Sequence, residues 1–263
     1  MNKPPVDRDT GHVAELLREA AGYLAPTGDS GQFVERVLAD TTDSFFDVDS
    51  PVGPVYVVAG LAGIRFIAPA ASPEEFARRY RERFRRLLSP ALGNHATSAG
   101  KVTAALAGEK VEVSLDLSWA TPFQQRVLKV VRDIPLGEVR PYMWVAWEAG
   151  APGASRAVGN VMANNPVPLL VPCHRVIRND GRIGNYAFGA GEKVRLLREE
   201  GVSPEELVKA PYLATPTTGI VCHATCRNAK RIRSENRRPF RSAREAVTAG
   251  YRPCKVCRPV ATA

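Results

Sequence analysis

The sequence predicts an α+β protein built from several small domains, and three observations support this prediction. Short β-rich runs and an amphipathic helical pattern alternate between residues 44 and 118, as in a small α/β scaffold. Helical patterns dominate residues 119–203, where two of them flank a glycine turn. Four cysteines then gather in residues 217–263, a segment with few apolar residues that a bound metal would help to fold.

Composition restricts the class of protein. A chain of 263 residues has room for one large domain or two to three small ones. No apolar run reaches the roughly 18 residues that a membrane helix needs, so we expect no membrane association. Residues 1–9 are charged and precede no apolar run, so no secretory signal is expected. We therefore predict a cytoplasmic protein with reduced thiols, which favours metal or nucleophile roles for its cysteines.

The first part of the chain carries structural patterns only. Residues 1–43 are expected to form a helical extension, with two short helices within 11–40. In the scaffold of residues 44–118, Val55–Val58 and Ile64–Ile67 are predicted to pair as a hairpin. A helix is predicted over Glu74–Leu88, because aromatic and aliphatic residues recur at four-residue intervals. Alternation predicts a last strand over Val111–Leu117.

Residues 119–203 are predicted to be largely helical. Thr121 as N-cap and Pro122 in the first turn predict a helix that continues over Phe123–Ile134. Helices over Tyr142–Ala149 and Ser155–Ala163, separated by a Gly150–Gly153 turn, have the outline of a helix-turn-helix. Residues 204–216 contain several prolines and are expected to be a linker before the C-terminal domain, residues 217–263.

The charge of the chain lies in that last domain. Of the 36 basic and 27 acidic residues, 11 and 2 respectively lie in 211–263, so the net charge of +9 belongs to this segment and the remainder is neutral. A basic domain of this kind usually faces phosphates. A solvated basic tail is the alternative, which a metal site inside the segment disfavours.

Cys173 stands alone in Pro172-Cys173-His174-Arg175, after the apolar run 167–171. A thiol with a pKa of about 8.5 is mostly protonated at neutral pH, so a nucleophilic role needs a neighbour that lowers this pKa or accepts the proton. A buried structural cysteine is the usual alternative. A direct cysteine–histidine dyad is disfavoured, because neighbours on an extended chain point to opposite faces.

The other four cysteines have the spacing of a zinc site. Cys222-x3-Cys226 is followed, after 27 intervening residues, by Cys254-x2-Cys257, which supplies four soft ligands for tetrahedral Zn2+. A pair of disulfides is the alternative. We predict one Zn2+ and no organic cofactor.

The segment 165–177 closely resembles the active-site segment of the O6-alkylguanine-DNA alkyltransferases. The resemblance extends from about Ser50 to Gly201 through Thr121–Gln124, Ile134–Val139, Arg156–Gly159 and Gly184–Tyr186. It implies an RNase H-like fold for residues 44–118 and a winged helix-turn-helix-like alkyltransferase domain for 119–203. It also implies that double-stranded DNA with alkylated bases is the partner of a monomeric protein.

The resemblance also implies residue roles. Cys173 would take the alkyl group from O6 of guanine, with O4-alkylthymine as a further substrate, and keep it irreversibly. His174 would reach the thiol through a water and be oriented by Glu200. The groups implied to shape the site and stabilise the departing guanine are Asn165, Tyr142, Tyr186 and Lys193.

The remaining implied roles concern DNA. Because O6 lies within the stacked duplex, the nucleotide must be flipped out of it, and Arg156 matches the side chain that fills the gap. The helix predicted over Ser155–Ala163 would be the recognition helix, and the small residues Ala157 and Gly159 would let it approach the minor groove. Arg175 is a further expected DNA contact. Phe188 departs from the family, where a small residue is common, which argues against bulky alkyl groups.

The four-cysteine segment resembles the zinc domain of the Ada-type alkylation-repair proteins, through residues 217–227, Ser234–Asn236 and Ala249–Cys257. There the first cysteine accepts a methyl group from a methyl phosphotriester, a role that corresponds to Cys222. The family carries this domain at its N-terminus, followed by an AraC-type module that is absent here. A structural zinc clamp on DNA is therefore the alternative, and an alkylation-damage binding or regulatory protein is the alternative to repair.

Overall fold

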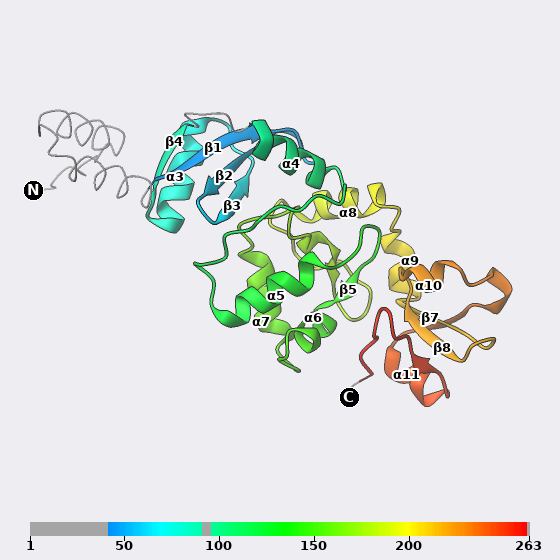
Figure 1. The fold of residues 1–263 in the computed structure, drawn as a ribbon. Helices are drawn as coiled ribbons and strands as arrows, with labels where there is room; N and C mark the ends of the chain where they lie inside the picture. Colours follow the sequence, from blue (N-terminus) through cyan, green and yellow to red (C-terminus); the bar gives the residue numbers. More distant parts are fainter. Residues whose placement is uncertain (1–41, 91–95, 262–263) are drawn as a thin grey trace, which may run out of the picture. The chain divides into compact units, whose positions relative to one another are not determined.

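The structure is a computed structural model that describes residues 42–90 and 96–261, in two compact units divided between Asp116 and Leu117. The helices expected in residues 11–40 lie outside the described residues. In the described part, helices and strands mix as the α+β prediction requires (Figure 1). No helix of this part is both long and apolar enough to cross a bilayer.

The first unit contains a four-stranded sheet in the order β3-β2-β1-β4. Its strands are β1 (Thr42–Val48), β2 (Val55–Gly60), β3 (Gly63–Ala68) and β4 (Leu87–Pro90), and only β4 runs parallel to its neighbour β1. β2 and β3 pair antiparallel, which confirms the predicted hairpin. Helix α3 (Pro73–Phe84) places Phe76 and Tyr80 against Val58 and Phe66 of the sheet, and α4 (Ala96–Leu106) follows.

Two predicted elements of this unit were wrong in part. The helix expected over Glu74–Leu88 ends at Phe84, where Arg85 turns left-handed at φ 54°, and Leu88 belongs to β4. Leu88 still packs on the same core, so the periodic pattern reported burial beyond the end of the helix. The strand expected over Val111–Leu117 is reduced to one bridge between Leu115 and Ile64. Gly63 permits this approach, since a Cβ there would lie 2.4 Å from a backbone oxygen.

The second unit begins with three helices. Helix α5 (Pro122–Arg132) starts with the predicted cap: Gln124 N–H donates to Thr121 Oγ1 over 3.3 Å, and Thr121 N–H donates to Gln124 Oε1 over 2.8 Å. Helices α6 (Tyr142–Glu148) and α7 (Ser155–Ala163) confirm the two shorter predicted helices. The turn between them contains Gly150 and Gly153 with positive φ, a conformation that glycine adopts without strain.

A short parallel pair of strands lies beside these helices. β5 (Arg140–Pro141) pairs with β6 (Val176–Ile177), which brings the loop before α6 next to the Cys173 segment. Helix α8 (Ala190–Glu199) packs Leu197 into the same core as Val139 and Ile177.

The C-terminal part of this unit is a small sheet in the order β10-β8-β7-β9 (Figure 1, orange to red). Its strands are β7 (Tyr212–Thr215), β8 (Ile220–His223), β9 (Arg238–Phe240) and β10 (Arg252–Pro253). Helices α10 (Arg227–Lys230) and α11 (Ala243–Thr248) complete it. The segment expected as a linker, 204–216, holds helix α9 (Pro204–Lys209) and β7, because Tyr212 and Ala214 are core residues of this sheet. We call residues 209–260 the four-cysteine module.

Candidate functional site

Cys173 lies at the start of a 3-10 turn, Cys173–Arg175, directly before β6. Its side chain is buried, with 3% of the residue exposed. The Asn165 amide holds it there: Nδ2 donates to Val171 O over 2.9 Å and to Cys173 Sγ over 3.3 Å, and Oδ1 accepts from Val167 N–H over 3.1 Å. Asn165 therefore holds both ends of the segment Val167–Val171 and contacts the Cys173 sulfur.

A buried carboxylate joins the two residues that follow. His174 Nε2 lies 2.8 Å from Glu200 Oε1. Arg175 donates to the same carboxylate through Nε over 2.9 Å and Nη2 over 2.8 Å, and through Nη1 to Ile134 O over 2.8 Å. His174 Nδ1 is buried without a hydrogen-bond partner in the described structure, which leaves it as the ring atom able to exchange a proton with the site.

Burial and charge set the protonation of this group. Burial raises the pKa of the Cys173 thiol, against the hydrogen bond from Asn165 and the positive charge of Lys193. Burial lowers the pKa of His174, and Glu200 opposes this effect. Burial also raises the pKa of Glu200, but the hydrogen bonds from His174 and Arg175 outweigh it and bring that pKa to about 2. These shifts favour a neutral Cys173 thiol, a Glu200 carboxylate and a neutral His174 ring at neutral pH.

Lys193 is fully buried beside Cys173. Its Nζ donates to Val176 O over 2.6 Å. Burial lowers its pKa to about 8, while a negative charge on Cys173, in the thiolate form, acts in the opposite direction. The group remains mainly protonated at neutral pH and would favour a thiolate at Cys173.

Two tyrosines border the same site. Tyr186 lies edge-on to His174 with ring centroids 6.1 Å apart, and its buried hydroxyl has no hydrogen-bond partner in the described structure. The Phe188 ring also lies edge-on to Tyr186, with ring centroids 5.4 Å apart. Tyr142 lies against Gly184, where a Cβ would come within 2.7 Å of the tyrosine hydroxyl. For both tyrosines burial and then the charge of Cys173 raise the pKa, so both stay hydrogen-bond donors.

The predicted DNA contacts separate into two groups. Arg156 and Gly159 line one open cavity of about 490 Å3 together with Tyr142, which was predicted for the catalytic group, and Cys173 itself does not line this cavity. Arg156 is exposed on α7, as a contact to DNA requires, and Ala157 is half-buried there. Arg175 is instead bound to Glu200 and Ile134, with 14% of its side chain exposed. The sequence did not indicate that second role, because adjacency to the histidine gives no signal of a shared carboxylate.

The four remaining cysteines come together as predicted. Their Sγ atoms all lie within 4.8 Å of one another and all four residues are buried, which fits a tetrahedral Zn2+ with Zn–S bonds of about 2.3 Å. Backbone and amide groups point at the sulfurs: His223 N–H donates to Cys257 over 3.4 Å and Asn228 Nδ2 to Cys254 over 3.5 Å. Such donors suit thiolate ligands.

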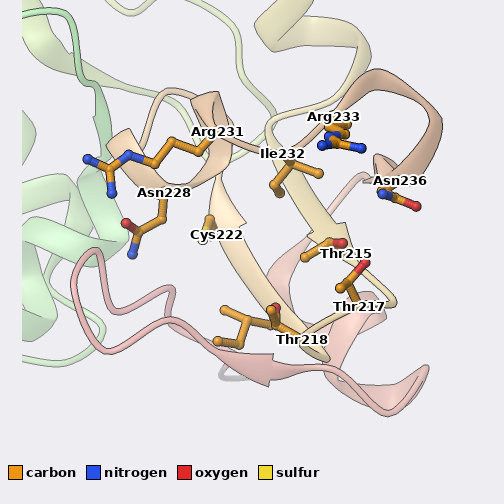
Figure 2. Close-up of a pocket in the computed structure, with 10 residues that line it drawn as sticks. Thr215, Thr217, Thr218, Cys222, Asn228, Arg231, Ile232, Arg233 and Asn236 are labelled. Atoms are coloured by element: carbon orange, nitrogen blue, oxygen red, sulfur yellow. The ribbon is translucent and has the colours of Figure 1, made fainter.

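A pocket of about 550 Å3 reaches Cys222 (Figure 2). Asn228 and Arg231 are among its lining residues, and three threonines also line it: Thr215, Thr217 and Thr218. Exposed Arg233 lies on its rim. The pocket thus offers donors and positive charge around one of the four sulfurs.

Comparisons with known proteins match the two parts of the second unit in which these residues lie. The family model "6-O-methylguanine DNA methyltransferase, DNA binding domain" matches residues 122–202, and "Metal binding domain of Ada" matches residues 209–260. A methylated-DNA–protein-cysteine methyltransferase of Mycobacterium tuberculosis is 38% identical over 167 residues, which covers 61% of this chain and 94% of the relative. The enzyme of the same name from Salmonella typhimurium is 34% identical over 166 residues and 93% of its length, against 59% of this chain.

Solved structures are similar as well. The Mycobacterium tuberculosis OGT in complex with DNA is 34% identical, with a TM-score of 0.49, and the match covers 63% of this chain and 98% of that one.

Proposed function

This chain belongs to the methylated-DNA–protein-cysteine methyltransferase family, and from that premise we propose that it repairs double-stranded DNA by moving the alkyl group of O6-alkylguanine onto its own Cys173. The observation that carries the proposal is the buried group of Cys173, Asn165, His174 and Glu200. The resemblance extends the substrate range to O4-alkylthymine.

The reaction is a displacement at the alkyl carbon. The thiol proton leaves toward His174, whose positive charge Glu200 stabilises over 2.8 Å. Sγ then forms a bond to the alkyl carbon as the carbon–O6 bond breaks, and the electron pair goes to guanine. Tyr142, Tyr186 and Lys193 supply donors and positive charge for the departing purine. A thioether is a poor leaving group, so each protein molecule reacts once.

The nucleotide must come to the sulfur. Cys173 is 3% exposed and its loop is held by Asn165, so the thiol cannot reach into a stacked duplex. Extrusion of the base costs a few kcal/mol, and less for a damaged base. Exposed Arg156 on α7 would fill the gap, while Ala157 and Gly159 let that helix approach the minor groove.

The finer architecture is part of the proposal. We assign an RNase H-like fold to residues 44–118, a winged helix-turn-helix to 119–203, and the zinc domain to the four-cysteine module, residues 209–260, because β7 of the expected linker belongs to its sheet. The sheet order β3-β2-β1-β4 and the α6–α7 pair support the first two assignments. We further propose that the protein acts as a cytoplasmic monomer.

Cys222 is proposed as a second acceptor, for the methyl group of a methyl phosphotriester. The observation that favours this over a structural clamp is the pocket that reaches Cys222 and is also lined by Asn228 and Arg231, which could hold a phosphate oxygen. Zn2+ bound by the four cysteines would keep their sulfurs ionised at neutral pH.

Mass spectrometry tests both acceptors. The protein is incubated with a duplex that carries a single O6-methylguanine, or with one that carries a methyl phosphotriester, and its peptides are mapped. We expect one methyl group on Cys173 in the first case and on Cys222 in the second, and Cys173→Ala should bind the first duplex without reacting. A methyl group on another residue of that variant would overturn the assignment. An unmodified Cys222 would favour the clamp.

A further inference from the structure

The loop Pro135–Arg140 lies between the two sulfur sites of the second unit and contacts residues of both. At its centre, Gly137 N–H donates to Glu200 Oε2 over 3.1 Å, and Gly137 O accepts from Lys230 Nζ over 3.1 Å. A Cβ on Gly137 would lie 2.8 Å from Glu200 O and 3.3 Å from Lys230 Nζ. The two peptide groups that flank Gly137 therefore connect the Glu200 carboxylate, which contacts His174, to Lys230 of the four-cysteine module.

Two neighbouring contacts fix the same loop. Thr225 Oγ1 accepts from Val139 N–H over 2.9 Å in a buried position. Glu138 is also buried: it pairs with Arg140 and accepts from Arg227 N–H over 3.0 Å. Buried groups of this kind tolerate little displacement, because a lost partner leaves a desolvated charge or amide.

The positions of Lys230 and Thr225, which contact this loop, depend on the four-cysteine site. Helix α10, Arg227–Lys230, starts directly after the ligand Cys226, and Lys230 N–H donates to Cys226 O over 3.0 Å. Thr225 precedes the same ligand. The position of Cys226 therefore determines where Lys230 and Thr225 meet the loop.

We infer that the four-cysteine module is part of the base-repair machinery: Lys230 and Thr225 act as positioning residues that hold Gly137 so that its N–H keeps Glu200 aligned on His174. This inference rests on the proposed function of Cys173. It gives the module a role in alkyl transfer from guanine that does not require a reaction at Cys222.

The test uses the full-length zinc-loaded protein and four variants. Lys230→Met removes the ammonium group, Lys230→Arg retains a donor, and Thr225→Val removes the hydroxyl with little change in shape. Lys255→Met is the matched control, since it removes one positive charge from an exposed site of the same module. The rate of methyl transfer to Cys173 is measured in a single turnover at saturating O6-methylguanine duplex, which separates chemistry from DNA binding. Zinc content and the 15N signals of the His174 ring are recorded for each variant.

We expect Lys230→Met and Thr225→Val each to slow transfer about 3- to 10-fold, the effect of one lost hydrogen bond, and to shift the His174 signals. Lys230→Arg should restore much of the rate, and Lys255→Met should match the unaltered protein. Unchanged rates and His174 signals in both Lys230→Met and Thr225→Val, with zinc bound, would overturn the inference, as would equal slowing by Lys255→Met. If Lys230→Met loses its zinc, the transfer rate and the His174 signals of Thr225→Val decide whether the inference holds. An unaltered protein that transfers nothing to Cys173 would refute the proposed function instead, and the His174 signals would still test the contact.

Discussion

Replacement of Glu200 by glutamine tests the relay most directly. The carboxylate accepts hydrogen bonds from His174, from Arg175 and from Gly137 N–H. Glutamine has nearly the same shape, but its NH2 group would face one of these donors instead of accepting from it. The variant therefore keeps the packing and removes the charge that holds His174 and Arg175 together.

The size of the effect follows from the carboxyl pKa. The pKa lies at about 2 instead of 4.5, which corresponds to about 3 kcal/mol in favour of the charged form. The Glu200 side chain is 11% exposed, and partial solvent screening reduces the contribution of its charge to the free energy of unfolding to about 1–2 kcal/mol. We expect Glu200→Gln to lose about this much unfolding free energy at pH 7. If the same charge stabilises the His174 cation during transfer, the single-turnover rate falls about 5- to 30-fold.

The pH dependence separates this mechanism from general damage to the fold. Because the folded pKa of Glu200 is depressed, its stabilisation is present above pH 4.5 and is lost as the pH falls toward 2. Urea unfolding of both proteins should therefore show a difference in stability that is largest near pH 7 and shrinks progressively below pH 4.5. A difference of the same size at pH 3 and pH 7 would refute the reasoning, since a charge-based effect must titrate.

Two further predictions concern DNA and substrate size. Arg156→Ala should slow repair of duplex about 10-fold and of single-stranded substrate much less, because only the duplex must be unstacked at a cost of a few kcal/mol; equal slowing in single-turnover assays would remove the gap-filling role. Phe188→Gly should raise the rate with O6-benzylguanine about 10-fold relative to the rate with O6-methylguanine. The reason is that the Phe188 ring, whose centroid lies 5.4 Å from that of Tyr186, would no longer occupy the loop. An unchanged ratio of the two rates would show that Phe188 does not limit the size of the alkyl group.

Local signals in the sequence predicted much of the protein. The Thr121 cap, the hairpin of β2 and β3 and the spacing of the four cysteines are short-range patterns, and the structure bears out each one. They can be read from sequence because a helix cap, a tight turn or a pair of ligands three or four residues apart depends on neighbours along the chain. The resemblance also led to Asn165 and Cys173 and to His174 and Glu200, and the structure shows a contact within each of these two pairs.

Only the tertiary structure decided how distant groups share partners. Arg175 binds Glu200, 25 residues away, and Gly137 joins Glu200 to Lys230, 93 residues beyond the glycine. One lysine among the 36 basic residues carries no local mark of such a contact. The strand expected over 111–117 failed for a related reason, since alternation shows which side chains are buried but not whether a neighbouring strand is free to pair. Hydrogen bonds across such separations depend on how whole elements pack, which no window of the sequence contains.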